Sequence, residues 1–89
     1  MPFYIYILRS LKDGDLYTGH TADIEERLIR HNEGRISLTK NRRPLELVYL
    51  EEQEKRGEAM KRESYIKSPE GGPTKTSLIE NFNIDISVG

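Results

Sequence analysis

Five side chains in this sequence have the chemistry to bind charge or move protons, and four of them fall within the first 31 residues. Tyr6, Tyr17, Arg27 and His31 form that group, and Glu63 follows later. Phenol hydroxyls and an imidazole can orient or pass protons, a guanidinium binds oxyanions through a fork of donors, and a carboxylate can hold a divalent cation. Together these groups suit the hydrolysis of a phosphate ester.

Two predicted strands and a tight turn would bring the two tyrosines together. Residues 4–10 are β-branched, aromatic and almost continuously apolar, which predicts a strand covered on both faces. The turn at 12–15 contains Asp-Gly, a favoured hairpin pair. Residues 16–18 then form a short antiparallel strand that ends at Gly19, where the missing side chain permits a sharp bend or a close approach.

A helix that begins near Thr21 or Ala22 would carry Arg27 and His31. Thr21 is the candidate N-cap, and residues 32–34 should end the helix. Because Arg27 and His31 are four residues apart, they should point the same way along one flank of the helix. The buried stripe is expected to consist of Ile24, Leu28 and Ile29.

The second half of the chain adds a strand and two helices. A polar, basic loop at 35–44 leads to a strand at 45–50, with one face expected to hold Leu45, Leu47 and Tyr49. A helix over 55–67 would place four residues on one face by its three-and-four spacing: Ala59, Met60, Glu63 and Ile66. After a break at 69–73, Thr74 would cap a last helix that ends near Asn81, and 84–86 could add an edge strand.

These elements predict an α+β (α/β) domain spanning residues 1–89, with a small, largely antiparallel three-stranded sheet flanked by helices in the order ββαβα plus a terminal helix. Without cysteines, the chain has no disulfides and no thiolate metal sites. No stretch is long or apolar enough to span a membrane and no cleavable signal is visible, so the expected location is the cytoplasm.

Charge is unevenly distributed along the chain. The net charge is −1 and the pI is about 6.1, which on its own argues mildly against a nucleic-acid binder. Residues 27–43, however, contain six basic residues and one acid. Such a segment builds either a local positive surface or an ordinary solvated loop. The candidate phosphate-binding residues in the loop are Arg35, Lys40, Arg42 and Arg43.

The residues in this order and spacing resemble the GIY-YIG nuclease family, in its small stand-alone form, and are similar to the N-terminal nuclease domain of the excinuclease C subunit. The resemblance covers about residues 3–68. Its two motifs fall on Tyr4-Ile5-Tyr6 and Tyr17-Thr18-Gly19, with Tyr4 and Thr18 departing from the family pattern. The arginine eight residues after the motif glycine is Arg27, followed by His31, and the family's metal-binding glutamate falls on Glu63.

This resemblance implies a metal-dependent endonuclease that hydrolyses phosphodiester bonds in DNA, in repair or recombination. Glu63 would hold Mg²⁺ or Mn²⁺, Arg27 would bind a phosphate oxygen, and Tyr6 and Tyr17 would orient water and phosphate. His31 would be an auxiliary acid–base or positioning group. The family's later asparagine has no firm match, with Asn81 and Asn83 as candidates only.

Each of these residues also has an ordinary structural explanation. The tyrosines could be cross-strand aromatics, Arg27 a helix residue with a solvated head, and His31 a C-terminal helix residue. Glu63 could pair with Lys67 one turn later. A non-catalytic DNA-binding module on the same scaffold and a small structural or adaptor protein therefore stay as alternatives. The sequence attaches no functional role to His20.

The two explanations of Glu63 differ in what its replacement should do. If it holds an ion, Glu63→Gln should abolish cleavage without lowering stability, because a carboxylate on an apolar helix face is costly. If Glu63 is instead a structural partner of Lys67 or Arg27, the same change should lower stability.

Overall fold

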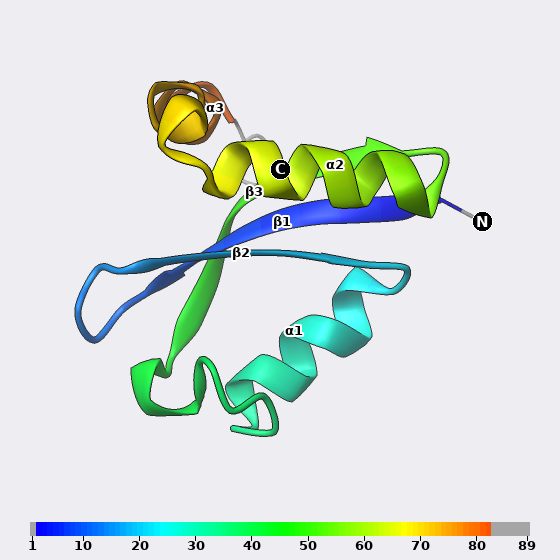
Figure 1. Ribbon diagram of the computed structural model, residues 1–89. Coiled ribbons are helices and arrows are strands. Elements are labelled where there is room, and N and C mark those ends of the chain that lie inside the picture. Colours follow the sequence, from blue (N-terminus) through cyan, green and yellow to red (C-terminus); the bar gives the residue numbers. More distant parts are fainter. Residues whose placement is uncertain (1, 83–89) are drawn as a thin grey trace, which may run out of the picture.

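Three strands form one antiparallel sheet in the order β2-β1-β3, with α1 on one face and α2 and α3 on the other (Figure 1). The computed structural model describes residues 2–82. The predicted fold class and element order are confirmed. The elements are β1 (Phe3–Ser10), β2 (Leu16–Thr21), α1 (Ile24–Asn32), the 3-10 turn η1 (Lys40–Arg42), β3 (Leu45–Gln53), α2 (Arg56–Lys67), the 3-10 turn η2 (Pro69–Gly71) and α3 (Gly72–Asn81).

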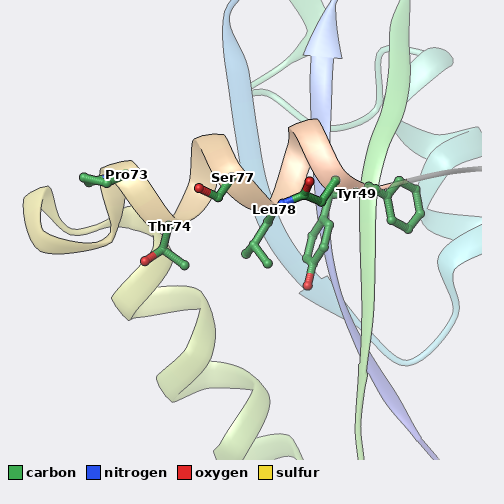
Figure 2. Close-up of a pocket in the computed structure, with 7 residues that line it drawn as sticks. Tyr49, Pro73, Thr74, Ser77 and Leu78 are labelled. Atoms are coloured by element: carbon green, nitrogen blue, oxygen red, sulfur yellow. The ribbon is translucent and has the colours of Figure 1, made fainter.

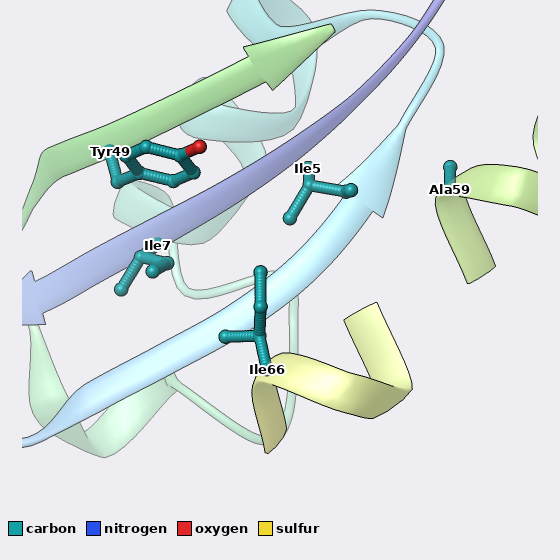
Figure 3. Close-up of a cluster of buried hydrophobic side chains, with 5 residues drawn as sticks. All are labelled: Ile5, Ile7, Tyr49, Ala59 and Ile66. Atoms are coloured by element: carbon teal, nitrogen blue, oxygen red, sulfur yellow. The ribbon is translucent and has the colours of Figure 1, made fainter. Parts of the chain in front are cut away.

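The central strand β1 is buried on both faces, as its continuous apolar run predicts. Ile5, Tyr6, Ile7 and Leu8 have no exposed surface. Successive side chains of a strand point to opposite faces, so Ile5 and Ile7 pack under α2 and α3 while Tyr6 and Leu8 face α1. Figure 3 shows the first of these two clusters, which consists of Ile5, Ile7, Tyr49, Ala59 and Ile66.

The edge strand β2 is longer than predicted. It runs through Gly19 to Thr21, so Gly19 lies inside the strand opposite Tyr6 and does not end it. Thr21 is therefore the last strand residue, and the N-cap of α1 is Asp23, whose carboxylate accepts a hydrogen bond from the Glu26 backbone N–H. The Thr21 hydroxyl instead accepts from the Asp23 backbone N–H at 3.1 Å.

A β-bulge in β3 makes the predicted strand face wrong. Ile7 pairs with Tyr49 and Leu8 with Leu47, so Val48 is an extra residue between two pairs. The bulge reverses the alternation. Leu45 and Leu47 consequently pack on the α1 side, while Tyr49 packs on the α2 and α3 side.

The helices also differ from the sequence patterns in detail. Ile29 of α1 and Met60 of α2 are 56% and 50% exposed, because the buried stripes are narrower than predicted. The last helix begins at Gly72, not at Thr74, with Pro73 in its first turn where a missing N–H costs nothing. The expected strand at 84–86 and Asn83 lie outside the described residues. Within residues 2–82, no helix is long and apolar enough to cross a membrane.

Candidate active site

Three aromatic side chains meet on the α1 face of the sheet. The ring of Tyr17 on β2 lies 6.2 Å from that of Tyr6 on β1 and 5.2 Å from that of His31 on α1, measured between ring centroids. The Tyr6 and His31 rings are 5.7 Å apart at a steep angle. The hairpin and the last turn of α1 thus bring three of the five sequence-predicted residues into direct contact.

His31 lies at the centre of a buried hydrogen-bonded chain. Its Nε2 is 2.9 Å from the Tyr6 hydroxyl, and its Nδ1 is 2.7 Å from the Thr39 hydroxyl in the loop after α1. All three residues have no exposed surface. In the tautomer that donates Nδ1–H to Thr39, Nε2 accepts the Tyr6 proton. The chain therefore connects β1, α1 and the basic loop through one imidazole.

Burial sets the protonation states of Tyr6 and His31. Burial first, and then the neighbouring Arg27 charge, lower the pKa of His31 to about 4. Burial, followed by Tyr17, raises the pKa of Tyr6 to about 12, although Arg27 acts in the opposite direction. At neutral pH His31 is therefore an uncharged base beside a protonated phenol.

Gly19 is required for this close packing. A Cβ added at Gly19 would lie 2.6 Å from the Tyr6 hydroxyl oxygen and 2.8 Å from Cζ of the same ring. It would also lie 3.1 Å from a ring carbon of Tyr17. Only glycine leaves room for both tyrosines against β2.

Arg27 lines a polar pocket next to this cluster. Its Nε is buried and has no hydrogen-bond partner among the described residues, and no carboxylate there lies within salt-bridge distance of its guanidinium. The pocket has a volume of about 390 Å³. Its lining residues are Phe3, His20, Thr21, Ala22, Arg27 and Arg56.

Glu63 lies on α2, which covers the opposite face of the sheet from Tyr6. Its carboxylate accepts a hydrogen bond from Nδ1 of His20 on β2 and pairs with Nζ of Lys67 at 2.6 Å. Burial raises the pKa of Glu63, but the hydrogen bonds and charges of Lys67 and His20 outweigh it, so the pKa lies below its ordinary value. The pairing with Lys67 considered from the sequence is thus present, and a second partner, His20, joins it.

Glu63 approaches the tyrosines around the β2 edge of the sheet. Nζ of Lys67, which pairs with Glu63, lies 5.9 Å from the centroid of the Tyr17 ring. The charge of Glu63 is also among the groups that raise the pKa of Tyr6. The five residues therefore lie around one strand edge, with Glu63 on one side of the sheet and the other four on the opposite side, and Tyr6 and His31 have no exposed surface there.

The possible metal ligands around Glu63 suit only one kind of metal site. Among residues 2–82, no three His, Cys, Asp or Glu side chains gather closely enough to form a cage. Mg²⁺ at phosphate sites is commonly held by one or two carboxylates, with waters and substrate oxygens as the other ligands. A carboxylate offers about four lone-pair directions, and His20 and Lys67 occupy two. The residues fit an ion that binds together with a phosphate.

The basic loop is ordered by contacts of its own side chains. Arg35 pairs with Glu33 at 3.1 Å, and Arg42 pairs with Asp15 at 3.6 Å. Nε of Arg43 donates to the Lys40 carbonyl at 2.7 Å. Of the four predicted phosphate-binding residues, Lys40 and Arg43 line one polar pocket of about 610 Å³. The other residues of this pocket are Lys12, Asn32, Asn41 and Pro44.

Asn81 does not join the predicted site. It lines a third, mostly apolar pocket of about 490 Å³ between α3 and β3 (Figure 2). Tyr49 and Leu78, both labelled in Figure 2, border this pocket and pack on the α2 and α3 side of the sheet. Tyr6 faces the other side, so the sheet separates Asn81 from the aromatic cluster.

The structure adds four residues that sequence reasoning missed. His20 is bonded to Glu63, Thr39 to His31, Arg56 borders the Arg27 pocket, and Lys12 borders the pocket of the basic loop. His20 directly follows the motif glycine, and a longer β2 would have placed it on the α2 face. Nothing in the local sequence distinguishes the other three from ordinary surface residues.

Comparisons with known proteins show which family the chain resembles in sequence and fold. The chain is 53% identical over 66 residues to the UPF0213 protein SSP2268 of Staphylococcus saprophyticus, covering 73% of this chain and 79% of that one. It is 46% identical over 66 residues, with the same coverage, to a UPF0213 protein of Staphylococcus aureus.

The solution NMR structure of the UPF0213 protein BH0048 from Bacillus halodurans has the same fold, with a TM-score of 0.53 and 36% identity over 88% of this chain and 85% of that one. The family described as the GIY-YIG catalytic domain matches residues 2–76. With its paired tyrosines, its motif glycine and a helical arginine and histidine beside them, the chain belongs to the GIY-YIG family.

Proposed function

We propose that this protein is an endonuclease that hydrolyses phosphodiester bonds in DNA with the help of a divalent metal ion, in repair or recombination. The family implies a nuclease-type protein with a nucleic-acid substrate, and its nucleases generally depend on a divalent metal. The observation that carries the proposal is the buried hydrogen bond between Tyr6 and His31, 2.9 Å long and adjacent to Arg27. It joins an oriented phenol to a neutral base.

The two pKa values limit the roles that Tyr6 and His31 can have. A phenol whose pKa is raised to about 12 holds its proton at neutral pH and cannot act alone as a base. His31, whose pKa is lowered to about 4, is uncharged at neutral pH and accepts the hydrogen bond of the Tyr6 hydroxyl at Nε2, but it is too weak a base to take the proton of that phenol. Because Tyr6 and His31 have no exposed surface, they would act by holding the aromatic cluster in place beside the phosphate. Tyr17 would orient the water or the phosphate beside it.

Two positively charged groups would neutralise the phosphate: the Arg27 guanidinium and a divalent ion held by Glu63. Arg27, without a carboxylate partner among residues 2–82, would bind a non-bridging phosphate oxygen. Glu63 would hold Mg²⁺ or Mn²⁺ at the strand edge, and the ion when bound supplies Lewis-acid activation and leaving-group stabilisation. His20 and Lys67 fix the direction of the carboxylate through their contacts with its two oxygens.

The basic loop would hold the flanking strand of the nucleic acid. Lys40 and Arg43 border the same polar pocket, while Arg35 and Arg42 already have carboxylate partners. Contacts to phosphates fix position without reading sequence. We therefore expect substrate structure, and not base sequence, to govern which DNA is bound.

The deciding experiment is a cleavage assay over branched, nicked, single-stranded and duplex DNA, with Mg²⁺, with Mn²⁺ and with chelator. Wild-type protein should cleave only with metal. Arg27→Ala and Glu63→Gln should lose cleavage, while Glu46→Gln, which removes a carboxylate from an exposed pair with Arg9, should keep it. DNA binding without cleavage in every metal would replace the proposal by the non-catalytic binding module.

A further inference from the structure

We propose that the pocket lined by His20, Arg27 and Arg56 is a binding site for a phosphate group of a nucleic-acid strand, with Arg56 as its second guanidinium. The proposal rests on the proposed nucleic-acid function and names a residue to which neither the sequence motifs nor the aromatic cluster assigns a role. Arg56 is the first residue of α2, whereas Arg27 is on α1. The pocket therefore joins the two helices that flank the sheet at the end of β2.

The composition of the pocket favours an anion. Of its six lining residues, two are arginines and one is histidine, and none is acidic. Neither arginine has a carboxylate within 4.0 Å among residues 2–82, although five other arginines do. Two unneutralised guanidinium groups at one pocket repel each other unless an anion lies between them. A tetrahedral oxyanion can accept bonds from both forks at once.

Arg27 gives an independent reason for a ligand. Its Nε is buried and has no hydrogen-bond partner in the described part of the chain. A buried donor that stays unpaired carries a desolvation cost, and such donors in proteins usually meet a ligand or an ordered water. A phosphate that draws the Arg27 guanidinium into the pocket would supply the missing acceptor.

The other residues that line the pocket suit a phosphate within a nucleic-acid strand better than a free phosphate ion. Phe3 and Ala22 give the pocket an apolar wall, and Thr21 borders it as well. The volume of about 390 Å³ exceeds what a single phosphate fills and leaves space for an attached sugar. We therefore infer an internal phosphodiester, with inorganic phosphate as a weaker occupant of the same place.

The test measures binding without divalent metal, so its outcome is separate from that of the cleavage assay. A 12-base-pair duplex without terminal phosphates is titrated in chelator against wild type, Arg56→Ala, Arg56→Lys and Lys61→Ala. Lys61 is exposed on the same helix and does not border the pocket, so its variant loses the same charge elsewhere. Thermal melts check that each variant folds, and Arg56→Gln replaces Arg56→Ala if the latter does not.

Arg56→Ala should weaken binding about tenfold, equivalent to ~1.4 kcal/mol, and reduce the salt slope by about one unit. Lys61→Ala should change binding less than twofold, and Arg56→Lys should restore part of the loss. In ¹⁵N-edited NMR spectra, inorganic phosphate should shift the Nε–H signal of Arg27 in wild type and less in Arg56→Ala.

Equal weakening by Arg56→Ala and Lys61→Ala would overturn the proposal, since it would show a general effect of charge. An Arg27 signal that ignores phosphate would overturn it as well. If phosphate shifts that signal but the duplex binds Arg56→Ala as tightly as wild type, the pocket takes free phosphate and the inferred strand site is wrong. Cleavage, which needs metal, tests the proposed function, whereas these binding measurements in chelator test the phosphate site.

Discussion

At the scale of the residue, the clearest effect of the fold is that it disfavours the protonated form of His31. Its pKa is lowered from the ordinary 6.5 to about 4, by burial and by the charge of Arg27. An unfolded chain therefore takes up a proton near pH 6.5 that the folded chain refuses until about pH 4. The stability that this difference contributes is fully present above pH 6.5 and is lost as the pH falls through that window.

We expect the free energy of unfolding to fall by on the order of 2 kcal/mol between pH 6.5 and 5, about 1.4 kcal/mol per pH unit. The paired carboxylates Glu51 and Glu63 have pKa values lowered from 4.5, so their contribution is lost mainly below this range. Urea unfolding at several pH values measures the slope, and His31→Gln should flatten it. An NMR titration with the His31 ring protonated near pH 6.5 would contradict the prediction.

A second prediction for a single residue concerns the contribution of Glu63 to stability. Because its carboxylate pairs with Lys67 and accepts from His20, we expect Glu63→Gln to lower stability by about 1–3 kcal/mol. This is the result that the sequence associated with a structural partner. The pairing does not exclude ion binding, so cleavage should also be lost.

Thermal melts of Glu63→Gln and of the control Glu46→Gln, each with and without millimolar Mg²⁺, measure this effect. Metal alone should change the melting temperatures little, since the donor set fits an ion that arrives with phosphate. A Glu63→Gln variant as stable as wild type would show that the contacts with Lys67 and His20 contribute nothing net.

Among the elements, β2 positions the aromatic cluster through Gly19. In Gly19→Ala the new methyl group would meet the Tyr6 hydroxyl at 2.6 Å, and Tyr6 is fully buried. We expect a loss of about 1–3 kcal/mol of stability, because the buried Tyr6 ring must shift. Gly57→Ala is the matched control, because a Cβ there meets nothing within 4 Å. Equal melting temperatures for both variants would refute the role of Gly19.

A separate prediction concerns the basic loop between α1 and β3. Arg42 is already paired with Asp15, whereas Lys40 and Arg43 border an open polar pocket. Replacing either Lys40 or Arg43 alone with glutamine should therefore weaken DNA binding more than Arg42→Gln does. The effect on stability should stay below about 1 kcal/mol, because the affected contacts are exposed. Fluorescence anisotropy with labelled duplex measures the affinities, and equal losses would mean that only total charge matters.

For the molecule as a whole, the net charge of −1 limits binding to nucleic acid. The Arg27 pocket and the basic loop hold six of the 14 Lys and Arg residues, so only a few phosphates can be contacted there at once. We expect weak binding with a strong salt dependence, in which log Kd changes with log salt by about 0.9 for each phosphate contacted. Titrations at four salt concentrations give the slope. A slope near zero would exclude phosphate contacts as the main source of affinity.

The sequence by itself determined the number, order and type of the elements, because periodicity, turn chemistry and breakers act locally. It also predicted Tyr6, Tyr17, Arg27, His31 and Glu63 as site residues, from a resemblance to a family whose membership is now shown. Their roles stay predictions. The sequence could not locate the end of β2 at Thr21 or the bulge at Val48. Both depend on which residues of neighbouring strands pair, and no local pattern records that pairing.

Only the tertiary structure decided which other residues contact the five predicted site residues. His20 meets Glu63 and Thr39 meets His31 because β2 and the basic loop pack against helices distant in sequence. Arg56 joins Arg27 at one pocket because α1 and α2 lie on opposite faces of the same sheet edge. Contacts of this kind depend on the packing of whole elements, and the same packing removes water from His31 and lowers its pKa.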